Sequence, residues 1–386
     1  MPLKYDNLFD DIAGFQPLIS AAKRAVKGKR HKPGAAMFMA NLETAVLQLE
    51  RELRDRCYVP GPYSEFTVTD AKTRNISAAP FRDRVVHHAL CGVLEPIFER
   101  GFVYDSYANR QGKGSHRAVD RYEKFRDRFA YVLRCDIYRY FPAIDHALLK
   151  ADLRRRITCD STLWLADLIV DRSNKQEPVD LHYPGDDLLA PLTRRRGLPI
   201  GNLSSQFFGN LYLDGMDHFC REVLSARGYV RYVDDFALFH DDPEILDQWR
   251  QRLASFLALR RLSLHPRKTQ IIATNEPTRF LGYELLPDGR RRLPEENIRR
   301  FRGRLRSMRD RWRAGTIEIA DVKQRVNAWI SHAEHADTWR LRHAVFEGRV
   351  FDPFLDNCFR DGGFRPKRKP VRPSHAARSA RRLLEQ

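Results

Sequence analysis

The 386-residue chain has few cysteines, no long apolar run and no excess of acidic residues. Its six cysteines are scattered without a C-x-x-C pair, which argues against a zinc ribbon or a disulfide framework and suits a reducing compartment. No apolar run reaches membrane-spanning length, and the first residues carry acids where a signal peptide would have an apolar core. We therefore expect a soluble protein of the cytoplasm.

What the chain has in abundance is positive charge. Lys and Arg number 68 against 50 Asp and Glu, a formal net charge of +18. A chain this basic usually binds a polyanion, most often nucleic acid. A ribosomal structural protein or a membrane-surface protein would share the charge, so the charge indicates the class of partner and not an activity.

Hydrophobic periodicity divides the first three quarters of the chain into candidate elements. Residues 172–196, rich in Pro, Asp and Arg, are expected to form an insertion loop. Ser204 follows a Gly/Pro turn and is expected to cap a helix that reaches about residue 225. The remaining expected elements are helices over 36–57 and 81–100, exposed short strands over 63–79 and a strand over 131–140.

Beyond residue 294 the sequence predicts an arginine-rich helix with one apolar stripe, then a second helix at about 319–333. Eleven arginines stand between 290 and 313 against three acidic residues. A solvated amphipathic helix is the simpler explanation, but the imbalance favours nucleic-acid contact. From Phe364 onward eight Lys and Arg predict a flexible basic tail. The predicted nucleic-acid contacts are Arg299, Arg302, Arg306, Arg309, Arg313, Lys367, Arg368 and Lys369.

Two adjacent aspartates, Asp234 and Asp235, interrupt the aromatic run RYVDDFALFH at 231–240 and predict the turn of a hairpin. Asp is a common turn residue, so a surface turn would explain them. A divalent cation would also explain them, because it turns their repulsion into coordination. Asp136, at the end of a predicted strand, supplies a third carboxylate. Two such strands side by side can hold two Mg²⁺ ions roughly 3.5–4 Å apart, which activate a 3′-hydroxyl for phosphoryl transfer.

Eight stretches in order resemble the successive blocks of reverse transcriptases: KTRNI, PFRDRVVHHAL, SYANRQGKGSHRA, VLRCDIYRYFPAIDH, GLPIGNLSSQFFGNLYL, RYVDDFALF, LHPRKT and RFLGYEL. The resemblance runs from about residue 40 to 290. It implies an α+β right-hand polymerase with fingers, a palm built on an antiparallel sheet, and an α-helical thumb. The expected divisions are an N-terminal helical and basic extension 1–60, fingers 61–130, palm 131–290, thumb 291–360 and tail 361–386.

The resemblance also implies roles for individual residues. Asp136, Asp234 and Asp235 would be the catalytic, metal-binding carboxylates, joined by the Ile137 carbonyl. Lys268 would be a general acid near the departing pyrophosphate. The implied nucleotide contacts are Lys72 and Arg74 on the triphosphate, Phe141 as the ring that excludes a ribose 2′-hydroxyl, and Ile200, Gly201 and Gln206 beneath the nascent base pair. Singly, each has a plainer interpretation as a core, surface or helix-terminal residue.

Among reverse transcriptases, the block from Ile200 to Gln206, together with FRDRVVHHAL, SYANRQGKGSH and WISHAEHADTWRLR, looks most like the enzymes of diversity-generating retroelements, which copy a template-repeat RNA with errors opposite adenine. Ile200 stands where related enzymes usually have Gln. The resemblance implies two Mg²⁺ ions, with Mn²⁺ as an alternative. It implies as partners a structured template RNA, an RNA/DNA primer–template duplex, dNTPs and a small basic accessory protein, since no endonuclease or RNase H module is expected after the thumb.

Three other interpretations stay open. A reverse transcriptase of a retron or phage-defence system would share the chemistry with a different RNA. A non-catalytic RNA-binding protein on a polymerase scaffold would not need the intact carboxylates. An RNA polymerase is disfavoured by Phe141.

Overall fold

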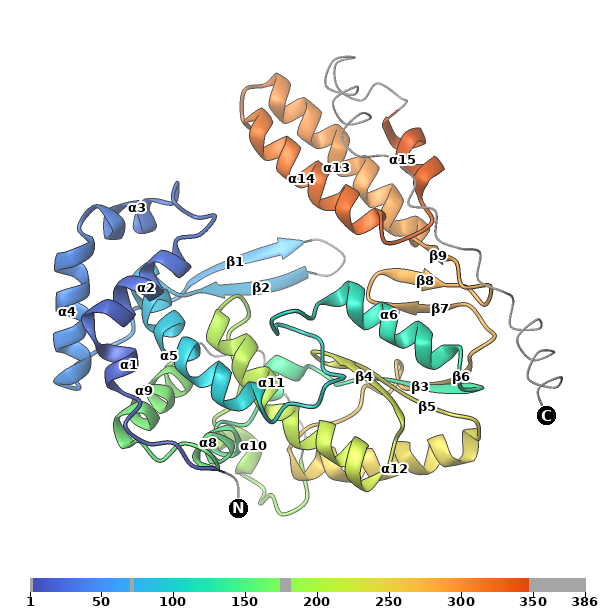
Figure 1. Cartoon of the computed structure of the whole chain (residues 1–386), viewed down its shortest axis with the longest axis horizontal. Coiled ribbons are helices and arrows are strands. Elements are labelled where there is room, and N and C mark those ends of the chain that lie inside the picture. Colours follow the sequence, from blue (N-terminus) through green and yellow to red (C-terminus); the bar gives the residue numbers. More distant parts are fainter. Residues whose placement is uncertain (1–2, 70–72, 174–181, 347–386) are drawn as a thin grey trace. The chain divides into compact units, whose positions relative to one another are not determined.

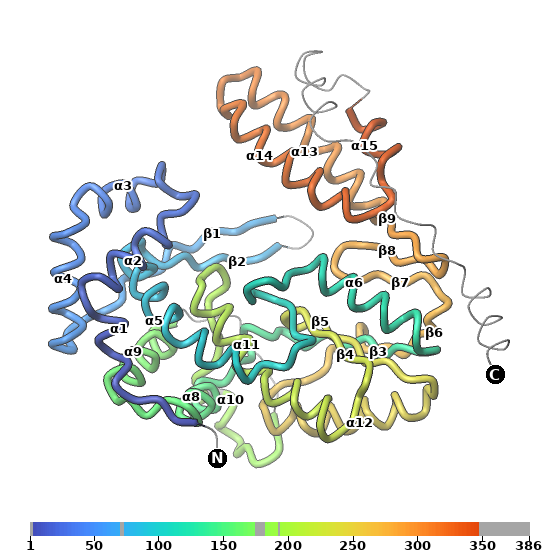
Figure 2. The backbone as a smooth tube through the Cα atoms, viewed as in Figure 1, coloured from blue at the N-terminus to red at the C-terminus, as the bar shows by residue number. Residues whose placement is uncertain are grey.

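The structure, a computed structural model, describes residues 3–69, 73–173 and 182–346. The described residues form two compact units, one from the ranges 3–114 and 133–271 and the other from 115–132 and 272–346. The chain therefore enters the second unit twice, as its colours show in Figure 2. The finer division into fingers, palm and thumb stays a prediction.

The elements are labelled in Figure 1. The helices are α1 Asp10–Ala13, α2 Phe15–Ala25, α3 Pro33–Ala40, α4 Leu42–Arg54, α5 Phe81–Glu99, α6 Ser115–Arg126, α7 Tyr140–Ala143, α8 His146–Arg154, α9 Asp160–Asp171, α10 Ala190–Thr193, α11 Leu203–His218, α12 Pro243–Leu259, α13 Glu295–Arg313, α14 Ile319–Ala333 and α15 Trp339–Phe346. The strands are β1 Ser64–Thr69, β2 Thr73–Ala78, β3 Tyr131–Asp136, β4 Gly228–Tyr232, β5 Asp235–His240, β6 Gln270–Ala273, β7 Thr278–Phe280, β8 Tyr283–Leu285 and β9 Arg291–Arg292.

The central sheet has the strand order β4-β5-β3-β6, so β3 and β5, which carry the predicted carboxylates, are neighbours. Strands β4 and β5 pair antiparallel. Nearly every residue of this pair is buried, which indicates that both faces of the sheet are covered. Helix α12 packs against β5 through a buried stripe of Leu246, Trp249, Leu253 and Leu257.

Helix α5 organises the rest of the first unit. Helices α1, α2, α3 and α11 all pack against it, and it buries apolar residues along its whole length. The hairpin β1–β2 is antiparallel and mostly exposed, with Ser64 opposite Ala78 and Thr69 opposite Thr73. The exposed short strands expected over 63–79 and the helix expected over 81–100 are confirmed.

Three expected elements are corrected. The helix expected over 36–57 is two helices, because Asn41 leaves the helical conformation at φ −117° and ψ 39°. Strand β3 ends at Asp136 and does not reach residue 140. The third correction concerns the helix expected to reach residue 225, which ends as α11 at His218 and continues as a π-helical turn over Phe219–Val223.

The insertion expected over 172–196 is described only in part. Its described residues contain the short helix α10, and 174–181 lie outside the described residues.

The second unit contains the three-stranded sheet β7-β8-β9 and the helices α6, α13, α14 and α15. The two helices expected after residue 294 are confirmed as α13 and α14. Their core is built from the predicted stripe, with Phe301, Leu305 and Met308 packed with Val322 and Val326. Within the described ranges, no helix is both long enough and apolar enough to cross a membrane.

Candidate active site

The predicted hairpin is confirmed, but only one of the two adjacent aspartates, Asp234, lies in its turn. Tyr232 pairs with Asp235, so the two turn residues are Val233 and Asp234, and Asp235 is the first residue of β5. Asp136 ends β3, the neighbour of β5. The Ile137 backbone N–H donates to the Asp234 carbonyl at 3.3 Å, which joins the end of β3 to the turn.

The three carboxylates form a negatively charged cluster. Burial, and then the charge of Asp136, raises the pKa of Asp234. Burial, followed by the charges of Asp234 and Asp136, raises the pKa of Asp235 to about 6. Such mutual destabilisation of the charged forms is typical of a site built for a positive partner.

Lys268, a cationic residue that the sequence predicted for this site, contacts the cluster directly. Its Nζ donates to Asp136 Oδ2 at 2.6 Å, and its side chain is 40% exposed. The backbone N–H of His265 donates to the Asp136 carbonyl at 2.7 Å, so the loop before β6 holds the end of β3. The structure thus brings Lys268 and Asp136 together from positions 132 residues apart.

The donor set suits a hard divalent cation, since it consists of carboxylate oxygens in a crowded negative cluster. Among the described residues, however, no three His, Cys, Asp or Glu side chains are arranged to hold a metal ion. The Asp136 carboxylate binds Lys268. The residue types still fit the predicted Mg²⁺ ions, because all three side chains are carboxylates. The roles of Asp136, Asp234, Asp235 and the Ile137 carbonyl as ligands stay predictions.

Phe141 lies half-buried in α7, which follows β3. A Cβ atom added at Gly209 of α11 would lie 3.2 Å from Phe141 Cε1, so a glycine at this position gives the ring room against the helix. The backbone N–H of Leu198 donates to the Phe141 carbonyl at 3.0 Å. Phe141 thus lies against the block that contains both Leu198 and Gly209, and its role against the 2′-hydroxyl stays a prediction.

The residues expected beneath the nascent base pair dock onto β2. The Ser77 N–H donates to the Ile200 carbonyl at 3.0 Å. Gly201 has φ +118°, and a Cβ there would lie 2.7 Å from Ile76 Cγ2. Both the backbone conformation and the lack of room for a Cβ atom therefore require glycine at this position. Gln206 is exposed on the first turns of α11.

The predicted N-cap at Ser204 is wrong. The N-cap residue of α11 is Asn202, and its side chain bonds across to the β2 end instead of capping: Oδ1 accepts from the Ala79 N–H at 3.1 Å and Nδ2 donates to the Ser77 carbonyl at 2.8 Å. Ser204 is buried inside the first turn, 3.3 Å from His87 Nδ1. Asn202 therefore fastens α11 to the hairpin β1–β2.

Of the two predicted triphosphate contacts, Arg74 is exposed on β2 opposite Val68, and its charge acts to lower the pKa of Asp234. Lys72 lies outside the described residues. The charge of Arg74 thus acts on Asp234, although burial and Asp136 outweigh it and the pKa of Asp234 is raised.

The arginines predicted to contact nucleic acid lie on the outer face of α13. Arg299, Arg302, Arg306 and Arg313 are exposed. Arg309 is half-exposed and pairs with its neighbour Asp310 at 2.9 Å. Lys367, Arg368 and Lys369 lie outside the described residues.

One arginine counted in the basic stretch is not available to a polyanion. Arg291 is buried, with its guanidinium bound to Asp120 and Glu123 of α6. The acids lie about 170 residues away in the sequence, so the count of eleven overstated the free positive charge.

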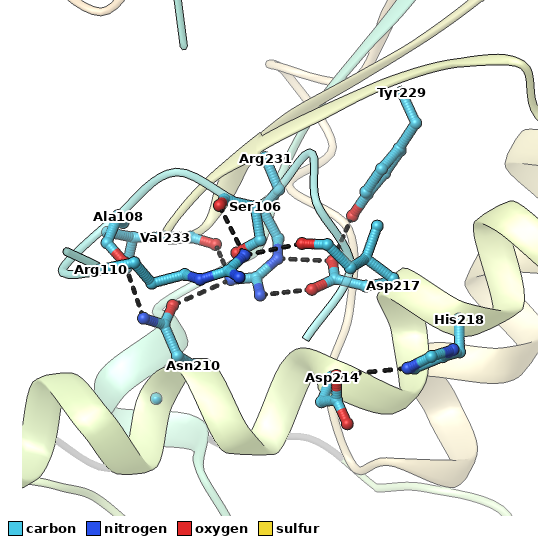
Figure 3. A network of polar contacts seen from close by, with 12 residues as sticks. Ser106, Ala108, Arg110, Asn210, Asp214, Asp217, His218, Tyr229, Arg231 and Val233 are labelled. Atoms are coloured by element: carbon cyan, nitrogen blue, oxygen red, sulfur yellow. Dashed lines mark hydrogen bonds and ion pairs between the residues drawn. The ribbon is translucent and has the colours of Figure 1, made fainter. Parts of the chain in front are cut away.

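Sequence reasoning gave no role to Arg231, which belongs to the same stretch as the aspartates. It is 1% exposed and binds the fully buried Asp217 of α11 through its Nε and Nη2 (Figure 3). An arginine within an otherwise apolar, buried strand requires a buried acid, and that rule was the available signal.

Comparisons with known proteins identify the family. The family described as reverse transcriptase (RNA-dependent DNA polymerase) matches residues 68–285. Protein YkfC of Escherichia coli strain K12 is 26% identical over 352 residues, covering 75% of this chain and 88% of YkfC. The group II intron-encoded protein LtrA of Lactococcus lactis is 21% identical over 311 residues, covering 63% of this chain and half of LtrA.

Among solved structures, a telomerase structure from Candida albicans, in complex with a fragment of telomeric RNA, aligns with a TM-score of 0.40 and 14% identity, over 65% of this chain and 49% of that one. The family match spans more than half of the chain and includes all three carboxylates. The mixed α+β polymerase fold expected from the sequence is confirmed. The chain belongs to the reverse transcriptase family, the RNA-dependent DNA polymerases.

Proposed function

We propose that this chain copies a structured RNA into DNA in the cytoplasm, by two-metal phosphoryl transfer at Asp136, Asp234 and Asp235. The observation that carries the proposal is the convergence of three carboxylates at the ends of two neighbouring strands, β3 and β5, within the region that matches the family. A non-catalytic RNA-binding scaffold would have no reason to keep this mutually repelling set.

The three carboxylates and the Ile137 carbonyl would hold the two ions, with Mn²⁺ able to replace Mg²⁺. Bound there, a divalent ion lowers the pKa of a hydroxyl nucleophile and stabilises charge on the phosphoryl group. Lys268 partly neutralises the cluster through its bond to Asp136 Oδ2. The same ammonium group can donate a proton to departing pyrophosphate.

The remaining roles concern the substrates. Lys72 and Arg74 would bind the triphosphate, and the Phe141 ring would occupy the space of a 2′-hydroxyl, which selects dNTPs. Gly201 brings backbone close to β2 without a side chain in the way, so Ile200, Gly201 and Gln206 can form a floor under the new base pair. The exposed arginines of α13, with Lys367, Arg368 and Lys369, would bind the phosphates of template RNA and of the primer–template duplex.

Within the family, we propose the enzyme of a diversity-generating retroelement, acting with a small basic accessory protein in mutagenic retrohoming. The support is Ile200, whose side chain offers only shape where a polar one could hydrogen-bond near the templating pair. Shape alone discriminates weakly, by roughly 1–3 kcal/mol for small apolar differences. A retron or antiviral-defence enzyme is the alternative, with the same chemistry on another RNA.

The test is sequencing of the cDNA that the full chain makes from its co-purified RNA and from a defined RNA template containing adenine. We expect cDNA with misincorporation concentrated opposite adenine, and Ile200→Gln should reduce it. Errors spread evenly over the four template bases would contradict the retroelement assignment and favour the defence role. Absence of cDNA from both RNAs would contradict the polymerase function itself.

A further inference from the structure

The turn that carries Asp234 has an unusual backbone. Val233 has φ +57°, and Asp234, the second turn residue, is not among the described residues with positive φ. Two-residue hairpin turns with positive φ at the first position normally have glycine there. A β-branched residue at positive φ is strained, and such strain persists only where the surrounding structure enforces it.

Arg231 supplies that enforcement. Its Nη1 donates to the Val233 carbonyl at 3.1 Å. This hydrogen bond ties the strained residue to the side chain of a strand residue two positions earlier in the sequence. The same nitrogen lies 3.3 Å from Asn210 Oδ1. The guanidinium that donates both hydrogen bonds is charged and buried. These hydrogen bonds are therefore stronger and more directional than bonds between neutral groups.

The guanidinium itself is fixed by α11. Nε donates to Asp217 Oδ1 at 2.6 Å and Nη2 donates to Asp217 Oδ2 at 2.5 Å, a two-bond fork that fixes the plane of the group. The Tyr229 hydroxyl donates to the same Asp217 Oδ1 at 2.5 Å. Figure 3 shows the arginine lying between Asp217 and Asn210.

A third segment closes the network around the backbone of Arg231. The Arg231 N–H donates to the Asp105 carbonyl and the Tyr107 N–H donates to the Arg231 carbonyl, both at 2.9 Å. Asn210 Nδ2 donates to the Ala108 carbonyl at 2.7 Å. These hydrogen bonds give a structural role to the stretch SYANR at 106–110, which the proposed chemistry does not use.

We propose that Arg231 is a positioning residue for DNA synthesis, which transmits the rigidity of α11 and of residues 105–108 to the Val233–Asp234 turn. Its guanidinium holds the Val233 carbonyl, and so fixes the direction in which Asp234 and Asp235 leave the turn. The inference rests on the proposed function, since it assigns Arg231 to the same site. A displacement of about 1 Å at a catalytic group can cost about 10²-fold in rate.

The experiment compares two full-length variants in one background. The control is Tyr229→Phe, which removes a bond to Asp217 but leaves every hydrogen bond of Arg231 in place. The test variant adds Arg231→Met and Asp217→Leu. Because both charges are removed together, no unpaired charge is buried, and such replacements are often neutral for stability.

We expect the test variant to unfold at the same temperature as the control. Its kcat for single-nucleotide addition should fall about 10²-fold, while KM for dNTP and affinity for primer–template stay unchanged. Binding of Mn²⁺, followed by electron paramagnetic resonance without nucleotide, should weaken. A stable test variant with the control's kcat and Mn²⁺ affinity would overturn the inference, whereas inactivity of the wild type would overturn the proposed function.

If the test variant unfolds at a lower temperature, a further variant that adds Val233→Gly separates loss of stability from loss of positioning of the turn. Glycine adopts a positive φ without strain, so the turn no longer needs to be held. Recovery of part of the missing kcat, at unchanged melting temperature, supports positioning through Val233. No recovery would show that the arginine acts only through global stability, and the inference would fail.

Discussion

Gly201→Ala should be among the most destabilising single-methyl changes in the first unit. Gly201 has φ +118°, and a non-glycine residue held in such a sparsely populated backbone region costs about 1–3 kcal/mol. The new Cβ would also lie 2.7 Å from Ile76 Cγ2, which forces β2 to shift, and overpacking of this kind costs about 1–3 kcal/mol. Together the two effects predict a decrease of about 2–6 kcal/mol in the free energy of unfolding.

A double-mutant cycle separates the two causes. Ile76→Ala removes the clashing methyl group but leaves the backbone conformation of Gly201 unchanged, so the double variant should recover the steric part and keep the backbone part. The coupling free energy, measured by urea denaturation of the full chain, should be about 1–3 kcal/mol. Additive single effects, or a decrease below about 1 kcal/mol for Gly201→Ala, would refute the reasoning.

Three further predictions concern the sugar, the salt dependence and the pH dependence. Phe141→Val should admit ribonucleotides, and unchanged discrimination between dNTP and rNTP in single-addition kinetics would count against a role in sugar selection. Replacing Arg299, Arg302 and Arg306 with Gln should flatten the plot of log K for RNA against log salt by about 0.7–0.9 for each arginine–phosphate interaction that the substitutions remove; an unchanged slope would mean that these side chains are merely solvated. Burial, followed by the charges of His88 and Arg84, lowers the pKa of the fully buried His87 from 6.5 to about 4. His87 therefore binds a proton below about pH 6.5 in the unfolded chain but only below about pH 4 in the folded chain. As the pH falls through this range, the difference should lower the free energy of unfolding by about 3 kcal/mol. In His87→Gln this part of the pH-dependent loss, measured by urea denaturation, should disappear.

Sequence reasoning succeeded where the signal is local. The apolar spacing in α5, α13 and α14 reports directly which face each helix buries, and these helices formed where expected. The run around Asp234 and Asp235 predicted the hairpin, since two apolar strands interrupted by polar residues have few alternatives, although the turn itself is Val233–Asp234.

The failures share a different cause, which is the dependence on partners distant in the sequence. The local sequence favours Ser204 over Asn202 as the N-cap. The hydrogen bonds that hold the Asn202 side chain go to Ser77 and Ala79, more than 120 residues away, so the local sequence cannot indicate them. Arg291 looks like free charge in the sequence because its acids lie on α6. Composition cannot reveal such pairs, because they exist only after the chain has folded.

Single-nucleotide incorporation on an RNA template by Asp234→Asn tests the central claim most directly. The matched control is Asp214→Asn, since Asp214 is also largely buried with a pKa raised by burial and by Asp217 to about 6, but it faces His218 of α11 (Figure 3). Loss of metal-derived charge stabilisation of several kcal/mol should slow Asp234→Asn by at least about 10³-fold, with unchanged RNA binding. The control should retain nearly the wild-type rate. A near-wild-type rate for Asp234→Asn would contradict the assignment of these carboxylates as the catalytic centre.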